Sequence, residues 1–310
     1  MITSLNMFLD RITSHSYKPC IAVAKAEDDT VLEAVKSMQF ERKVATFTLV
    51  GNKDKILAMA DELEVPVDSS RIIDLREEDA IAVRATALVK SGEADVPMKG
   101  HIMTSTFLKA ILKKDIGLFS DKDRIVSEIS IYDKVWGGPG LQMATCCGIC
   151  IAPDLNDKVK IINNAIALCH LLGMDNPRIA CLCALEKVNP AMPDTVDAAV
   201  LSQMNRRGQI TGGIVDGPFA LDNAVSPEEA RHKGLGGEVA GNADVLLMSD
   251  IRMGNVFHKS LVYLARKQIA STLMGPDVPV ILTSRSDPAP DRMISIALAI
   301  YLCQAMKDTR

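Results

Sequence analysis

The stretch CIAVAKAEDDTVLEAVKSMQF (20–40) decides the fold class of this chain. Its apolar start (20–26) predicts a buried strand, and the apolar residues three and four apart in 29–40 predict a helix with an acidic cap. The same pair recurs as strand-like 45–51, 71–75 and 94–100, alternating with helix-like 52–64, 77–94 and 104–115. Such repeats of fully apolar strands and amphipathic helices predict an α/β fold with a parallel sheet covered on both faces.

The rhythm of helices and strands breaks at RIVSEISIYDKV (124–135), whose residues alternate as in a strand and which is followed by the turn signal GGPG (137–140). We expect antiparallel pairing and a transition between domains at this point. The alternation then resumes in the second half of the chain. We expect helices over 154–174, 194–207, 253–270 and 290–306, and strands over 178–186, 210–217, 243–250 and 278–285.

Composition excludes several classes of protein. The 310 residues carry 35 basic and 39 acidic side chains, a net charge of −4, which argues against a binder of nucleic acid or anionic membranes. Hydrophobic residues make up 48%, which is typical of a globular chain. Polar Asn6, Asp10 and Arg11 interrupt any secretory signal, and the apolar run 294–306 is too short to span a bilayer. We expect a cytoplasmic protein.

Eight cysteines are spread along the chain, including Cys147 and Cys150 and the pair Cys181 and Cys183. They lie in strand-like apolar runs, and the spacing of four ligands that a zinc site needs is not apparent. With no signal peptide expected, free thiols are favoured over disulfides. We interpret these cysteines as small buried hydrophobic residues, with metal or redox use as the alternative.

Ligands of open parallel sheets bind outside the carboxyl ends of the strands. The segments that follow the predicted strands are rich in Lys, Arg, Ser, Thr, Asn, Asp and Gly. They contain neither the Gly-x-Gly-x-x-Gly pattern of dinucleotide binders nor a Walker phosphate loop. These segments are MKGHIMTS (98–105), LEKVNPAMPDT (185–195), VDGPFALDNA (215–224), SDIRMGNVFHKS (249–260) and SRSDPAPD (284–291).

The last segment carries the strongest signal. Ser284 and Arg285 end an apolar strand, and a helix begins near Pro290. The planar guanidinium of an arginine suits a phosphate, and a helix N-terminus adds amide donors for the same anion. With Asp287 and Asp291 close by, one interpretation is a phosphate site with a carboxylate base. The other is that the two aspartates cap the last helix and Arg285 pairs with one of them; the sequence leaves both open.

Other strand ends add candidate substrate-binding residues. Lys99 and Gly100 end a predicted strand, and a helix begins near Thr104. The first amides of that helix could bind an anion. The alternative is that Thr104 or Ser105 is only an ordinary helix cap.

In the second half, Asp216 ends a strand before a Gly-Pro turn, and Asn255 and Lys259 lie four residues apart on one helix face. His258 has no apparent partner and fits a packed or solvent-facing histidine better than a catalyst.

Taken together, the strand ends resemble the phosphate acetyl/butyryl transferase family, and within it the phosphate butyryltransferase branch. The resemblance runs from about Asp95 to the C-terminus and is densest in MKGHIMTSTFLKAIL (98–112), VDGPFALDNAVS (215–226) and VPVILTSRSD (278–287). It implies an enzyme for reversible acyl transfer: acyl-CoA plus phosphate gives acyl phosphate plus coenzyme A. Coenzyme A is then a substrate; no cofactor and no metal at the reacting centre are expected.

The resemblance also implies a fold like that of the isocitrate and isopropylmalate dehydrogenases. That fold has two lobes of three-layer α/β/α structure with a cleft between them, and the subunits form a homodimer or a higher even homo-oligomer. We expect residues 1–136 and 287–310 in the first lobe and 137–286 in the second. The last helix would return to the first lobe and bring the SRSD segment to the cleft.

Several roles follow from the resemblance. Ser284 would stabilise developing charge, Arg285 would hold the phosphoryl group, and Lys99 and Thr104 would add donors. The acetyl branch has its proposed base at the position of Asp291, and the butyryl branch has the familiar aspartate at that of Asp287. We favour Asp287 as the base for the thiol, because Asp291 falls in the expected first helical turn.

Two alternatives stay open: acetyl as the preferred acyl group, and a catalytically silent module that senses acyl-CoA or acyl phosphate. The chain departs from the family at Cys146 and Cys150, where an aspartate and an asparagine are usual, and at Tyr263, where the acetyl branch has an arginine for coenzyme A.

Overall fold

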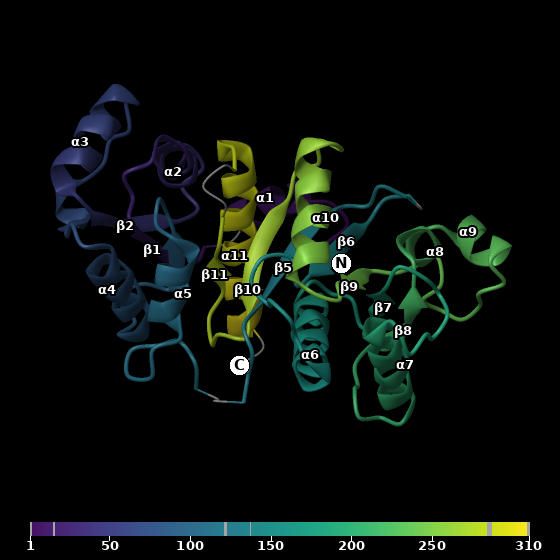
Figure 1. Cartoon of the computed structure of the whole chain (residues 1–310). Helices are drawn as coiled ribbons and strands as arrows, with labels where there is room; N and C mark the ends of the chain where they lie inside the picture. The colour runs from purple at the N-terminus through teal and green to yellow at the C-terminus, as the bar shows by residue number, and fades with distance from the viewer. Residues whose placement is uncertain (1, 15, 121–122, 137, 284–286, 309–310) are drawn as a thin grey trace. The chain divides into compact units, whose positions relative to one another are not determined.

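The computed structural model describes residues 2–14, 16–120, 123–136, 138–283 and 287–308. The chain forms two compact units (Figure 1). We call Asn6–Arg124 with Ala270–Arg310 the N/C unit, and Met1–Leu5 with Ile125–Ile269 the middle unit. Both boundaries differ from the expected ones after residues 136 and 286. The strand at 127–133 pairs with the hairpin partner that follows it, and the strand at 280–281 pairs with 96–99, so pairing assigns each to its unit.

The N/C unit is built on a mostly parallel sheet, as the sequence predicts. Its strand order is β3-β2-β1-β4-β11-β10, and all neighbouring pairs are parallel except β10–β11. The strands are β1 (Cys20–Ala24), β2 (Thr46–Gly51), β3 (Ile72–Asp74), β4 (Val96–Lys99), β10 (Ala270–Met274) and β11 (Val280–Ile281). Because β2 lies on one side of β1 and β4 on the other, the chain reverses direction across the sheet between β1 and β4.

Helices cover both faces of this sheet. The pair α4 and α5 packs together on one face, and α11 packs against both α1 and α2 on the other (Figure 1). The helices are α1 (Asn6–Thr13), α2 (Asp29–Val35) continued by η1 (Lys36–Glu41), α3 (Lys53–Glu62), α4 (Glu78–Lys90), α5 (Thr104–Ile111) and α11 (Ala289–Asp308), with the short turn η2 (Ser69–Arg71). The core includes Ile21, Leu32 and Phe107, each fully buried. Burial of such side chains stabilises the fold by about 2 kcal/mol each.

The middle unit has a sheet of order β5-β6-β9-β7-β8, in which only β5–β6 is antiparallel. The antiparallel hairpin expected after residue 124 is therefore confirmed. The strands are β5 (Ser127–Asp133), β6 (Leu141–Thr145), β7 (Arg178–Leu182), β8 (Ile214–Phe219) and β9 (Val245–Leu247). The helices are α6 (Leu155–Leu171), α7 (Pro193–Arg206), α8 (Leu221–Val225), α9 (Pro227–His232) and α10 (Ile251–Tyr263). The α/β fold class is confirmed.

Three local expectations are corrected. The helix predicted over 253–270 ends at Tyr263, and strand β10 begins at Ala270. Asp216 does not end its strand, because β8 continues through the following Gly-Pro step to Phe219. Cys146, Cys147 and Cys150 are buried as expected, but they follow β6 in a bend rather than lying in a strand. Cys146 has a positive φ of 69°, which no regular strand contains.

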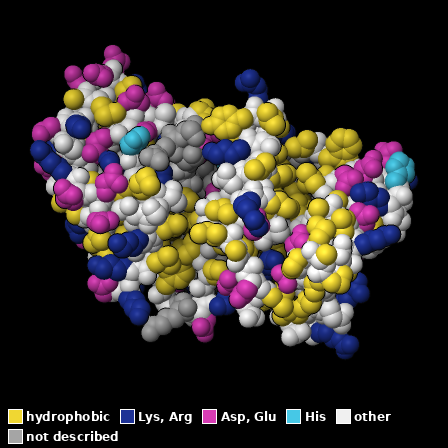
Figure 2. Space-filling view, in the orientation of Figure 1, with side chains coloured by type: hydrophobic (Ala, Val, Ile, Leu, Met, Phe, Trp, Pro, Cys, Tyr) yellow, Lys and Arg dark blue, Asp and Glu magenta, His cyan; other side chains and the backbone are white. Residues whose placement is uncertain are grey.

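The surface fits a charge-balanced protein. Over the region of α3 and α4, acidic and basic side chains are interspersed (Figure 2). Three large hydrophobic side chains along and just after α10 are exposed: Val256, Tyr263 and Leu264. None of the helices in the described part of the chain is long and apolar enough to cross a membrane.

Helix α10 approaches the cysteine bend through a glycine. A Cβ on Gly254 would lie 2.3 Å from the carbonyl oxygen of Cys146, so the helix fits only because this side chain is absent. We expect Gly254→Ala to lower the free energy of unfolding by about 2 kcal/mol, since overpacking of this kind costs about 1–3 kcal/mol.

Denaturant unfolding measures this effect. Gly236→Ala is the matched control, because a Cβ at Gly236 meets no atom within 4 Å. Equal stability of the two variants would contradict the close packing of α10 on the bend.

Candidate functional site

The candidate site lies at the carboxyl ends of β1 and β4 in the N/C unit. The amide of Gly100 donates to Ala24 O (2.9 Å), and that of His101 donates to Lys25 O (2.8 Å), so the two strands stay paired to their ends. A Cβ on Gly100 would lie 2.2 Å from Lys25 O, which explains the glycine. This is the position at which open parallel sheets bind ligands, where the strand order reverses.

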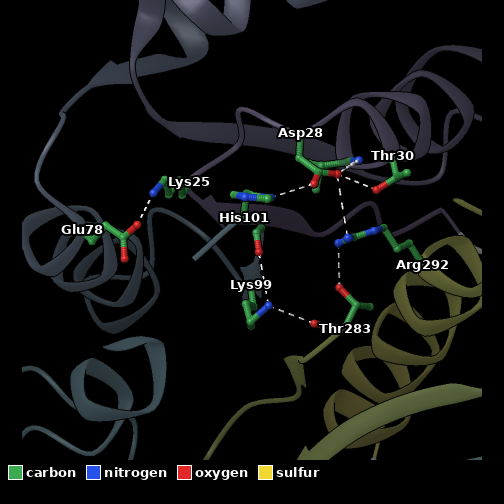
Figure 3. Close-up of polar contacts among 10 residues, drawn as sticks. Lys25, Asp28, Thr30, Glu78, Lys99, His101, Thr283 and Arg292 are labelled. Carbon is green, nitrogen blue, oxygen red and sulfur yellow. Dashed lines mark hydrogen bonds and ion pairs between the residues drawn. The ribbon is translucent and has the colours of Figure 1, made fainter. Parts of the chain in front are cut away.

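Lys99 is a buried cation at this edge. It is 1% exposed, and its Nζ donates to the carbonyl oxygens of Thr283 (3.1 Å) and Gly100 (3.4 Å) (Figure 3). A buried ammonium group is costly unless it is hydrogen-bonded. The bond to Thr283 joins the end of β4 to the residue that directly precedes Ser284 in the chain.

Arg292, in the first turn of α11, was not selected from the sequence. It is fully buried; its Nη1 donates to Thr283 Oγ1 (2.9 Å), and its Nη2 lies 3.8 Å from Asp28 Oδ1 (Figure 3). Burial lowers the pKa of Arg292 from its ordinary value, and the charges of Asp28 and Asp287 oppose that shift. A guanidinium stays charged under such conditions, so Arg292 supplies a fixed positive charge beside Thr283 and Asp28.

Asp28 is the N-cap of α2 and the centre of the polar network. It accepts hydrogen bonds from Val31 N (3.0 Å) and the Thr30 hydroxyl, and Nδ1 of His101 lies 3.2 Å from its Oδ2. Burial alone would raise the pKa of Asp28. The hydrogen bond from Thr30, the charge of Arg292 and the bonds from Val31 and His101 outweigh it, so the pKa lies below the ordinary value.

The structure brings several predicted site residues into this unit. Lys99 and Gly100 end β4, and Thr104 is the first residue of α5, whose N-cap residue Met103 makes no side-chain capping bond. Asp291 lies in the first turn of α11, as expected, and is 8% exposed.

Asp287 is half-buried, and its charge acts on Arg292. Ser284 and Arg285 lie outside the described residues.

The other predicted residues belong to the middle unit. Asp216 accepts hydrogen bonds from Ser202 Oγ and Gly217 N, both 2.9 Å long. Asn255 and Lys259 are exposed on α10; Asn255 Nδ2 lies 3.4 Å from Cys147 O, and Lys259 Nζ lies 5.8 Å from the centre of the Tyr263 ring.

His258, for which the sequence showed no partner, has one. Its Nδ1 lies 3.0 Å from Ser130 Oγ on β5. A bond between residues 128 apart in the chain leaves no local signal in the sequence.

The cysteines form no candidate metal centre. All eight thiols are free, and no group of three or more His, Cys, Asp or Glu among the described residues could hold a metal ion. A hydrogen bond with Cys150, together with burial, raises the pKa of Cys146, and burial raises that of Cys147. Such thiols are poor nucleophiles, since the thiolate is the reactive form.

Comparison with known proteins agrees with the resemblance read from the sequence. The family described as "Phosphate acetyl/butaryl transferase" matches residues 78–300, well over half of the chain. The chain belongs to this family.

Relatives at high coverage carry two activities in their names. A phosphate butyryltransferase of Clostridium beijerinckii is 43% identical over 287 residues, covering 93% of this chain and 94% of the relative. A phosphate acetyltransferase of Thermotoga maritima is 41% identical, covering 94% of this chain and 99% of its own.

Among solved structures, a branched-chain phosphotransacylase from Enterococcus faecalis V583 is similar, with a TM-score of 0.78 and 29% identity over 92% of this chain and 99% of that one. A 4-hydroxythreonine-4-phosphate dehydrogenase from Klebsiella pneumoniae shares the fold at a TM-score of 0.55 and 12% identity, over 93% of this chain and 100% of that one.

The charge of Asp28 leads to a prediction about acid stability. Because the pKa of Asp28 is lower in the folded chain than in the unfolded chain, its carboxylate contributes stability above the unfolded pKa, and this contribution is lost as the pH falls through the folded pKa. Asp28→Asn keeps an N-cap side chain but removes the charge.

We expect this variant to be less stable than the parent at pH 7 and the difference to shrink as the pH falls below about 4, the ordinary range of a carboxyl group. Urea unfolding at several pH values measures it, and Asp154→Asn at the exposed N-cap of α6 is the control. A stability difference that is the same at every pH would contradict the role of the Asp28 charge.

Proposed function

We propose that this protein is an acyltransferase that moves a short acyl group, butyryl or a short branched chain, between coenzyme A and inorganic phosphate. The observation that carries the proposal is the buried Lys99 at the end of β4. It precedes Gly100 and is hydrogen-bonded to Thr283, the residue before Ser284 in the chain. Lys99 and Arg292 are buried cations that both contact Thr283, the residue before the Ser-Arg-x-Asp segment in the chain, and such positive charge suits a dianionic substrate. Membership of the family supports the same reaction.

In this proposal, phosphate is bound by Arg285, by the first amides of α5 near Thr104 and by the charge of Lys99. Ser284 donates to the carbonyl oxygen on which negative charge develops. Asp216, Asn255 and Lys259 of the middle unit stay candidate substrate-binding residues.

The transfer is direct. Attack by phosphate on the thioester expels the thiolate, and the buried thiols of Cys146 and Cys147 are unsuited to carry the acyl group. Coenzyme A is a substrate, and the proposal needs no further cofactor. The expected cytoplasmic location and even-numbered homo-oligomer stay predictions.

The activity is tested by thiol release from acetyl-, butyryl- and isobutyryl-CoA, with and without phosphate. We expect phosphate-dependent release that is fastest with butyryl- or isobutyryl-CoA. Fastest release from acetyl-CoA would identify a phosphate acetyltransferase instead. Binding of acyl-CoA without any release would identify a sensing module, and release without phosphate would contradict the reaction.

Arg285 is tested by substitution. Arg285→Ala should lower kcat/KM for phosphate about 10²-fold, because a charge-assisted hydrogen bond contributes about 1.5–3 kcal/mol. The KM for acyl-CoA should change little. Arg207→Ala, at an exposed arginine after α7, is the control. An unchanged kcat/KM for phosphate would contradict the proposed role of Arg285 in phosphate binding.

The choice of base for the thiol is tested by a pair of variants. Asp287→Asn should lower kcat about 10²-fold or more, the usual contribution of a general base. Asp291→Asn should reduce kcat less, because Asp291 lies within the first turn of α11 and its charge suits that helix end. The reverse order of effects in steady-state kinetics would assign the base to Asp291.

A further inference from the structure

His101 forms a His–Asp pair at the end of β4. Its side chain is 49% exposed, and its Nδ1 lies 3.2 Å from Oδ2 of Asp28 (Figure 3). A carboxylate can only accept a hydrogen bond, so Nδ1 carries the hydrogen and donates it. In the neutral ring, Nε2 is then left as a proton acceptor on the other side of the imidazole.

The carboxylate that orients His101 is itself held from three sides. Val31 N and the Thr30 hydroxyl donate to Oδ1 of Asp28, and Arg292 lies beside the same oxygen. Rotation of the Asp28 side chain would therefore break the N-cap of α2 and move the carboxylate away from the buried guanidinium of Arg292. Because these contacts hold the carboxylate of Asp28 in place, its hydrogen bond keeps the imidazole of His101 in one orientation.

The position of the pair fits the phosphate half of the reaction. His101 directly follows Lys99 and Gly100 and precedes Thr104 by three residues. It thus lies within the segment to which the proposed function, on which this inference rests, assigns phosphate donors.

The net reaction moves one proton from the phosphate to the sulfur of coenzyme A, and a different side chain can serve each end of that movement. When monohydrogen phosphate attacks the thioester carbon, a C–O bond forms, the C–S bond breaks, and the phosphate hydroxyl must lose its proton. The departing thiolate gains a proton to become a thiol. One carboxyl group, Asp287 or Asp291, is assigned to the thiol, and that assignment leaves the phosphate proton without a group to receive it.

We propose that His101, oriented by Asp28, is the acid–base residue for inorganic phosphate. As acyl phosphate forms, Nε2 of His101 takes the proton of the phosphate hydroxyl; in the reverse direction it returns that proton to the departing phosphate. Histidine is the side chain that most often acts as a general acid or base, and its two ring nitrogens let it hold Asp28 with one and exchange a proton with the other.

The charged groups around His101 come from several elements. Asp28 faces it from the start of α2, with Arg292 of α11 behind that carboxylate. Lys99 of β4 is two residues earlier and is turned toward Thr283, and the ion pair of Lys25 with Glu78 lies beside the strand end (Figure 3).

The first experiment uses His101→Gln in the full-length protein. Phosphate-dependent thiol release from butyryl-CoA is measured from pH 5 to 9 at a constant concentration of monohydrogen phosphate. The parent should lose rate as the pH falls, because a protonated imidazole cannot accept the phosphate proton. His101→Gln should show a kcat about 10²-fold lower, little change in KM for butyryl-CoA, and no such acid limb.

His232→Gln is the matched control, since His232 is an exposed histidine at the end of α9 in the middle unit and should match the parent.

A second pair of variants separates chemistry from folding. Asp28→Asn keeps an N-cap side chain at α2 and, assayed below its lowered unfolding transition, should reduce kcat about 10-fold through loss of the oriented tautomer. His101→Ala should regain rate when free imidazole is added. A rate loss that imidazole does not restore would make His101 a structural residue and overturn the proposal, as would His101→Gln with the kcat and pH profile of the parent. If the parent itself releases no thiol from any of the acyl-CoA substrates, the proposed function fails first.

Discussion

The positive charge of Arg292, placed in the interior of the N/C unit, is the constraint on which the rest of the site depends. This side chain is fully buried, and removal of Asp28 would break the buried ion pair between the two residues. Breaking such a pair typically costs about 3–5 kcal/mol. The contacts of Arg292 therefore link three segments: the cap of α2, the first turn of α11 and Thr283, two residues after β11. The neighbouring segments carry the substrate-binding candidates, and these contacts help to hold them in place.

Much of the fold could be predicted from the sequence, because its strands and helices carry their own periodic signal. The run CIAVA forms β1 over Cys20–Ala24, and the acidic residue expected to cap the next helix is Asp28. Strand β10 was missed, since ASTLM follows helix-like residues without a break and its strand identity comes from antiparallel pairing with β11. The unit boundaries were displaced for the same reason: pairing, rather than local pattern, decides where β5 and β11 belong.

The site was predictable in part. Lys99, Gly100 and Thr104 could be selected because the carboxyl end of a parallel strand is a general location for ligands. Arg292 and His101 were passed over, because PDRM reads as an ordinary first turn of a helix and KGH as a strand end. Their roles come from contacts with Asp28 that span 264 and 73 residues of chain. No local pattern encodes contacts over such separations; only the folded chain reveals them.

The discontinuity of the N/C unit has a consequence for biosynthesis. Its sheet is completed by β10 and β11, and its buried arginine is supplied by α11, all after residue 269. On the ribosome, the middle unit is fully translated before the last strands of the N/C unit are made. A nascent chain arrested near residue 270 would thus contain one finished unit and one with an exposed sheet edge. That intermediate is where chaperones would be expected to act, and the cationic centre forms only once translation is nearly complete.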